Sequence, residues 1–178
     1  FDKQFGSSRA AEHLATIYLR QGYAMQAYFT LQAQTKACDD CIGSHTQFML
    51  VACLMDDPSS VKQSMQKIRE RAQSQKIIGG ASTTLGSLKK HIEKQECKHI
   101  SMPELVSLNK LLLQYQTKEI NANKRFELLL NLHQLAEYDK NTTESQKYLF
   151  EVYELLPEIK VGEVVFNNLM NSGNYAAA

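Results

Sequence analysis

The chain has 178 residues, of which 43% are hydrophobic and 22% charged, and its formal net charge at pH 7 is +1. This hydrophobic content excludes wholesale disorder, and the nearly balanced charge gives no overall field that would attract nucleic acid or a membrane surface. Only 3 prolines and 8 glycines are present, which is too few for the frequent tight turns of a β-sandwich or barrel.

Apolar residues recur at three- and four-residue steps along most of the chain, and this pattern predicts nine helices joined by short connections. The expected ranges are 8–20, 24–36, 44–55, 58–72, 84–92, 102–115, 123–138, 142–156 and 158–171. Gly22 is an expected helix stop, while Asp57 and Ser101 are expected N-caps, each with a proline in the first turn that follows. Residues 172–178 carry no pattern and are expected to fray.

The Gly79–Gly80 pair, followed by Ala81 and Ser82, is expected to be a loop between two groups of helices. This prediction places helical hairpins with one tetratricopeptide-like repeat in residues 1–75. It places further hairpins, packed on the same core, in residues 82–171.

Helix pairs of about 35 to 40 residues are typical of α-solenoids. The predicted fold class is therefore all-α, a right-handed stack of helical hairpins of the tetratricopeptide-repeat-like class. The residues that match the tetratricopeptide pattern at the right spacings are Leu14, Ala15, Tyr18, Gly22, Ala27 and Leu31. A looser match runs from Leu132 to Pro157, 118 residues further along the chain.

Motifs that carry common chemistries are absent from the sequence. It contains no phosphate-binding glycine loop, no nucleophile elbow and no His-Glu-x-x-His helix. We therefore expect no catalytic residue, no metal and no cofactor. His133 is flanked by Leu132 and Leu135, and it is expected to be a partly buried, hydrogen-bonded histidine.

The cysteines form the one unusual cluster. Cys38 and Cys41 lie in the connection after the second predicted helix, and they could form a local disulfide, remain free thiols, begin a zinc site or act as a redox pair. The acids between them raise the pKa of a thiol, which disfavours fast redox chemistry. Cys53 lies on an apolar helix face and is expected to be a core residue. Cys97 lacks the spacing of a zinc knuckle.

Two groups of residues are candidates for binding. Tyr23 and Phe29 flank the best repeat match and could stack on a ligand, although such residues are more often interhelical core. Lys89, Lys90 and Lys94 form a basic edge that could meet an anionic partner, and the alternative is a solvated helix face. Nucleic acid is not an expected partner, because no aromatic residues interleave the basic run.

The segment Cys38-Asp-Asp-Cys-Ile-Gly-Ser-His45, the later segment 83–97 and the tetratricopeptide-like pairs resemble a known family. They are similar to the soluble C-terminal regions of bacterial O-antigen polymerase/ligase-type membrane proteins, a group that includes pilin O-oligosaccharyltransferases. In that family the membrane-embedded part transfers the glycan, and the helical region lies outside the cytoplasm. This chain is expected to hold no membrane span itself, because its longest apolar run, residues 48–55, is far shorter than the roughly 20 residues required.

The resemblance implies a non-catalytic helical-repeat interaction module on the periplasmic side of a bacterial inner membrane, attached to a membrane-anchored parent. Its partner would be a protein or a glycan on a concave helical face. Three alternatives remain: a free-standing tetratricopeptide-like adaptor that binds a protein, a cytoplasmic location, and a Cys/His metal-dependent enzyme.

An oxidising periplasm, which the resemblance implies, favours the disulfide among the alternatives for Cys38 and Cys41. We therefore predict a Cys38–Cys41 disulfide, with Cys53 and Cys97 bonded to neither member of the pair.

Overall fold

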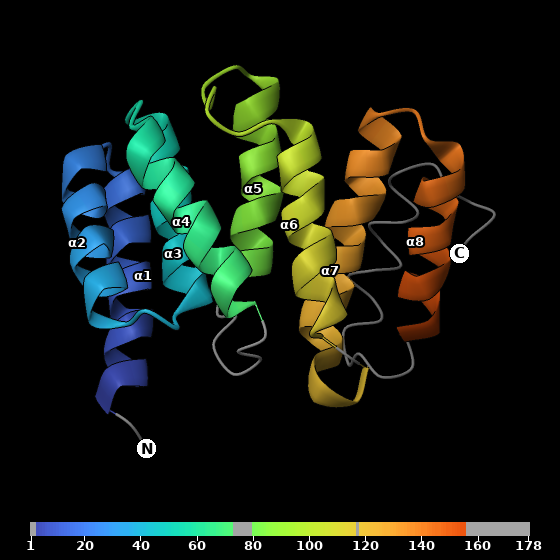
Figure 1. The fold of residues 1–178 in the computed structure, drawn as a ribbon, viewed down its shortest axis with the longest axis horizontal. Coiled ribbons are helices and arrows are strands. Elements are labelled where there is room, and N and C mark those ends of the chain that lie inside the picture. The colour runs from blue at the N-terminus through green and yellow to red at the C-terminus, as the bar shows by residue number, and fades with distance from the viewer. Residues whose placement is uncertain (1–2, 73–79, 117, 156–178) are drawn as a thin grey trace. The chain divides into compact units, whose positions relative to one another are not determined.

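The computed structural model of the chain describes residues 3–72, 80–116 and 118–155. These residues form eight α-helices and no strand (Figure 1), so the all-helical prediction is confirmed for them. The helices are α1 (Lys3–Arg20), α2 (Ala24–Ala37), α3 (Ile42–Leu54), α4 (Pro58–Arg71), α5 (Ala81–Glu93), α6 (Met102–Gln114), α7 (Lys118–Tyr138) and α8 (Thr142–Leu155). The ninth predicted helix at 158–171 and the tail at 172–178 lie outside the described residues.

The chain divides into two compact units, Phe1–Tyr115 with α1 to α6 and Gln116–Ala178 with α7 and α8. The predicted division at Gly79–Gly80 lies elsewhere, inside the first unit. The first unit continues past this point because α5 packs against α3, and because a disulfide joins Cys53, in α3, to Cys97, after α5.

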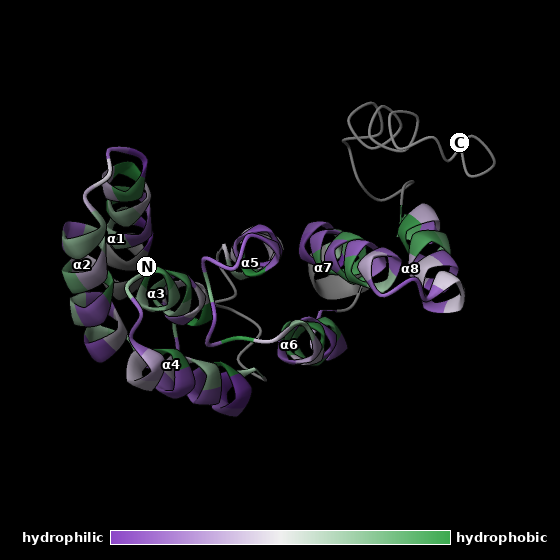
Figure 2. Cartoon of the chain, turned by 90° about the horizontal axis from the view of Figure 1, so that it is seen from above, coloured by the Kyte–Doolittle hydropathy of each residue, from purple (hydrophilic) through white to green (hydrophobic). Residues whose placement is uncertain are grey.

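Helix α3 forms the core of the first unit. It contacts α1, α2, α4 and α5, and every residue from Ile42 to Cys53 is buried. Figure 2 shows α3 with apolar colouring and these neighbours around it. A helix that is largely apolar on all sides is stable only when it is enclosed in this way. Among its polar side chains, Gln47 donates from Nε2 to the Glu12 carbonyl oxygen (3.0 Å) and to Thr16 Oγ1 (2.8 Å).

Three of the helical hairpins share one local geometry. In α1–α2, α3–α4 and α7–α8, the second helix has 14 residues. The first helix is followed by a residue with positive φ: Gly22 (81°), Asp56 (58°) and Lys140 (56°). Helix α4 begins 34 residues after α2, at Pro58 against Ala24, and α8 begins 118 residues after α2, at Thr142.

The same backbone hydrogen bond closes each of these three turns. The donors and acceptors are Tyr23 N to Tyr18 O (2.8 Å), Asp57 N to Ala52 O (2.9 Å) and Asn141 N to Ala136 O (2.9 Å). This bond satisfies a carbonyl that the end of a helix would otherwise leave unpaired. The residue four positions after each of these donors lies in the second helix and is buried in all three hairpins: Ala27, Val61 and Ser145.

Candidate binding site

Cys38 and Cys41 close the connection between α2 and α3. Cys38 is the C-cap of α2, Cys41 is the N-cap of α3, and a disulfide joins them with their Cα atoms 5.4 Å apart. This is the pairing that the sequence analysis predicts. Both residues are buried, so the disulfide holds the turn and does not present a sulfur for exchange with another protein.

The structure corrects the interpretation of Cys53. The residue is buried as expected, but it is bonded to Cys97, with the two Cα atoms 5.1 Å apart. All four cysteines are therefore in disulfides, and no thiolate is left for the zinc or free-thiol alternatives. Among the described residues, no group of three or more His, Cys, Asp and Glu side chains is placed to hold a metal ion.

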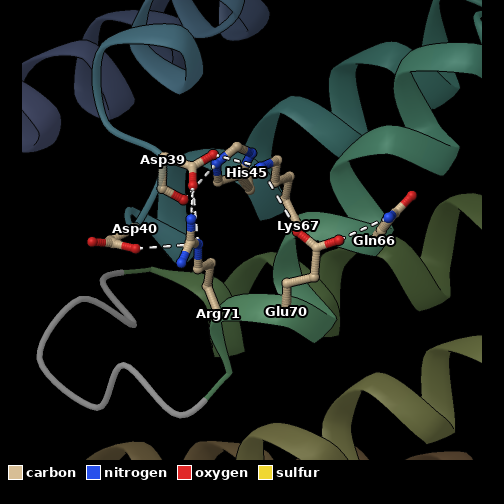
Figure 3. A network of polar contacts seen from close by, with 7 residues as sticks. All are labelled: Asp39, Asp40, His45, Gln66, Lys67, Glu70 and Arg71. Atoms are coloured by element: carbon tan, nitrogen blue, oxygen red, sulfur yellow. Dashed lines mark hydrogen bonds and ion pairs between the residues drawn. The ribbon is translucent and has the colours of Figure 1, made fainter.

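Figure 3 shows the polar network beside the first disulfide. The Asp39 carboxylate accepts hydrogen bonds from Lys67 Nζ (2.8 Å) and from Arg71, whose Nε lies 2.9 Å away and whose Nη2 makes a second contact. These partners, Lys67 first, lower the pKa of Asp39. The network connects the α2–α3 turn to α4, and because its groups are largely solvent-accessible we assign it a positioning role and little stabilisation.

His45 lies under this network and is buried. Its Nε2 is 3.1 Å from the backbone carbonyl oxygen of Asp39. Since a carbonyl oxygen only accepts, Nε2 carries the proton. Burial lowers the pKa of His45, so the ring is neutral at pH 7. Nδ1 is then an acceptor, and it has no partner among the described residues.

A pocket of about 230 Å³ opens between α2 and α4, over α3. Its polar lining includes Gln32 and Lys36 from α2, His45 from α3, and Gln63 and Ser64 from α4. Ser64 is only 2% exposed, and its hydroxyl makes no hydrogen bond to any described residue. No sequence pattern predicts this site, because its members come from three helices and share no motif.

The outer face of α2 leads into this pocket. Met25, Phe29, Gln32 and Lys36 are spaced by four, three and four residues, which places them along one side of a helix. Met25 is 51% exposed and Phe29 58% exposed, while Gln32 and Lys36 line the pocket. The exposed side chains of Met25 and Phe29 therefore form an apolar strip that leads into the polar pocket.

Phe29 is placed by its neighbour Tyr28. The two rings meet edge to face with their centroids 5.7 Å apart, and Tyr28 is anchored in turn by a hydrogen bond from its hydroxyl to Asp57 Oδ2 (2.7 Å). The alternative that Phe29 is interhelical core is wrong in this structure.

Tyr23 is 51% exposed, so it is not core either, and it occupies an unusual position. It is the N-cap of α2, where its side chain makes no capping hydrogen bond. The equivalent residues of the other two hairpins do cap: Asp57 accepts from the backbone N–H groups of Ser59 and Ser60, and Asn141 Oδ1 accepts from the N–H of Glu144. Of these three hairpins, only the first has an aromatic residue at this position and no capping hydrogen bond from its side chain.

The predicted basic edge lies on α5. Lys89 is paired with Glu93 (3.2 Å), while Lys90 and Lys94 are exposed. Figures 1 and 2 show α5 and α2 on opposite sides of α3, so the structure does not bring these lysines together with Tyr23 and Phe29.

The second unit contains a serine, a histidine and a glutamate in contact. Ser145 Oγ donates to Glu137 Oε1 (3.0 Å) and lies 2.9 Å from His133 Nδ1. A nucleophilic serine needs the histidine between it and the acid, whereas here the serine is in the middle. The contact therefore joins α7 to α8, and His133 is the buried, hydrogen-bonded residue that its neighbours predict.

Comparison of the chain with protein-family models, with curated proteins and with solved structures returned no match. Within the described residues, no helix combines the length and the apolar character that crossing a membrane requires.

Proposed function

We propose that this chain is a non-catalytic helical-repeat interaction module of the tetratricopeptide-like class. It binds a protein or glycan partner through the exposed surface of α2 and its N-cap, where Phe29 and Tyr23 lie. It works outside the cytoplasm, as part of an envelope glycan polymerase/ligase-type protein.

The observation that carries this proposal is Tyr23. A tyrosine at an N-cap position forgoes a hydrogen bond that asparagine or aspartate provides, and the ring is half exposed. Its presence is therefore not explained by the stability of α2. Departures from local sequence rules are concentrated at functional sites, and Phe29 on α2 is a second exposed aromatic ring near this end of the helix.

The repeat geometry supports the fold part of the proposal. The 34-residue offset between the α1–α2 and α3–α4 hairpins equals the tetratricopeptide period. Contacts also run between α1 and α2, α2 and α3, and α1 and α3, which is how consecutive helical hairpins stack.

Two disulfides support a location outside the cytoplasm, because structural disulfides persist in oxidising compartments. The proposal of a membrane-anchored parent rests on the resemblance of the sequence to polymerase/ligase-type membrane proteins. Transmembrane helices encoded upstream of Phe1 in the same gene would support it, and a short gene without them would favour a free-standing adaptor.

Replacing Tyr23 and Phe29 together with alanine is expected to reduce partner capture by at least about tenfold, because exposed aromatic side chains supply much of the binding energy of an interface. The measurement is recovery of envelope proteins and glycans on the immobilised chain. The thermal midpoint should change by only a few degrees, because both rings are more than half exposed.

The matched control is the Phe150→Ala/Tyr153→Ala variant, which removes two equally exposed rings from α8. It should capture the partner like the original chain. Equal capture by both variants would contradict the proposal, and unfolding of the Tyr23/Phe29 variant would show that these residues serve the fold instead.

Tyr23→Asn should raise the free energy of unfolding by about 1 kcal/mol, because asparagine caps the equivalent turn before α8. Urea denaturation measures this gain. Tyr23→Ala removes the same ring without supplying a cap, so it separates the two effects; equal stability of the two variants would rule out a capping deficit at this position.

A further inference from the structure

We propose that the pocket between α2 and α4 binds a monosaccharide-sized ligand that carries a carboxylate beside several hydroxyl groups, such as a uronic acid. This inference rests on the proposed function and specifies what the module recognises next to the apolar strip of Met25 and Phe29.

Polar groups that face the pocket are available to a ligand. Ser64 lines it, and its hydroxyl makes no hydrogen bond to another described residue. The hydroxyl is not among the buried atoms that lack a partner, so it is open to water in the pocket, and a ligand hydroxyl would take the place of that water. The neutral His45 ring leaves Nδ1 as an acceptor in the same lining.

The amides of Gln32 and Gln63 extend this hydrogen-bonding capacity. They come from the two helices that flank the pocket, and each amide offers both donors and an acceptor. A ligand with several adjacent hydroxyl groups, which both donate and accept, matches this set. Phe48, in the floor, offers an apolar surface for the carbon–hydrogen face of a sugar ring.

The charges of the lining favour an anion. Lys67 and Asp39 face the pocket but are already paired with each other. Arg71 makes a second contact with the Asp39 carboxylate, so that carboxylate is neutralised within the protein. Lys36 lines the pocket without an ion pair to any described residue. Its ammonium group is therefore the charge available to a ligand, and a carboxylate is its complement.

The volume limits the size of the ligand. At about 230 Å³ the pocket is smaller than those that enclose drug-sized molecules, which start at about 300 Å³. One sugar ring with its carboxylate is therefore the unit recognised. The ring belongs either to a free sugar acid or to the end of a longer acidic glycan, and these two sources share the same chemistry.

Calorimetric titration with glucuronate, glucose and acetate tests the ligand class on the full oxidised chain. Glucuronate should bind with a dissociation constant in the millimolar range, and glucose and acetate should each bind at least about tenfold more weakly, because each lacks half of the recognised groups. Absence of glucuronate binding, or equal binding of glucose, would overturn the proposal.

Two variants locate the binding. Lys36→Gln and Ser64→Ala should each weaken glucuronate binding by about fivefold or more, since each removes one hydrogen-bonding group. The control is Lys147→Gln, which removes an exposed lysine from α8 and should leave binding unchanged. If Lys36→Gln and Ser64→Ala both bind like the original chain, the site is not this pocket.

A uronate trisaccharide distinguishes the two sources of the ligand. If the trisaccharide binds more tightly than the monosaccharide and Phe29→Ala loses this gain, the ligand is an acidic glycan that continues along the apolar strip of Met25 and Phe29. Equal binding of the two indicates a free sugar acid. Failure of glucuronate binding while Tyr23 and Phe29 remain necessary for partner capture would overturn the ligand class alone. Insensitivity of partner capture to those two residues would overturn the proposed function instead.

Discussion

Replacing Cys53 and Cys97 together with alanine is expected to lower the free energy of unfolding by about 4 kcal/mol. The bond joins residues 44 positions apart, so the oxidised unfolded chain is constrained over a long loop. Removing the constraint restores the entropy of that loop to the unfolded state, and this favours unfolding. Urea denaturation of the original and variant chains under oxidising conditions measures the loss.

The matched control is the Cys38→Ala/Cys41→Ala variant. That disulfide joins residues only three positions apart, and the same loop-closure argument gives about 2 kcal/mol. The test is therefore whether the Cys53/Cys97 variant loses more free energy of unfolding than the Cys38/Cys41 variant. A larger loss from the short loop would show that the Cys38–Cys41 bond acts through the folded turn, and that the entropy of the unfolded chain does not dominate.

The sequence predicts the helices well because helix signals are local. Asp57 with Pro58, and Ser101 with Glu104, form the expected N-caps, and in the second case both hydrogen bonds of a capping box are present. Helices α1, α3, α5 and α7 begin earlier than expected, at Lys3, Ile42, Ala81 and Lys118. Helix boundaries depend on the first turn, where an apolar pattern carries little information.

The second copy of the hairpin was missed for a physical reason. Its turn has Asp56 where the first has Gly22, and aspartate is among the few other residues that adopt positive φ with little strain. A turn pattern that requires glycine therefore does not match α3–α4, although α4 begins 34 residues after α2. The looser match 118 residues along the chain does coincide with a hairpin of the same geometry, with Lys140 in this position.

The sequence does not predict which residues far apart in the chain come into contact. The Cys38–Cys41 bond joins near neighbours, so its partners are visible in the chain, whereas Cys53 and Cys97 meet only because α5 packs on α3. The pocket depends in the same way on how α2 and α4 lie across α3. Spacing reveals which residues share one helix face, and it does not reveal which faces of different helices meet.

Phe29 and the pocket are connected through the turn that Asp57 organises. Asp57 caps α4, which carries Ser64, and it also holds Tyr28, against which Phe29 packs. One carboxylate thus helps to set the relative positions of Phe29 on α2 and of the polar pocket residues on α4. A change at Asp57 is therefore expected to affect both stability and the proposed binding surface.

Asp57→Ala is expected to lower the free energy of unfolding by about 2 to 4 kcal/mol. Oδ1 accepts from the backbone N–H groups of Ser59 and Ser60, both at 3.1 Å, and Oδ2 accepts from the Tyr28 hydroxyl at 2.7 Å. Losing an N-cap costs about 1 kcal/mol, and losing a hydrogen bond to a charged group costs about 1.5 to 3 kcal/mol. Urea denaturation at pH 7 measures the sum, and Tyr28→Phe isolates the second contribution.

Acidification provides an independent test of the same carboxylate. Hydrogen bonds from Ser60, Tyr28 and Ser59 hold the pKa of Asp57 far below its usual value. Because the folded-state pKa is the lower one, this stabilisation is complete above the unfolded-state pKa of about 4 and is lost as the pH falls below it. Asp57→Asn keeps an oxygen acceptor at the cap but does not titrate, so its stability should fall less between pH 5 and pH 2 than that of the original chain. Parallel losses in the two proteins would mean that other carboxylates, and not Asp57, govern the acid sensitivity of the first unit.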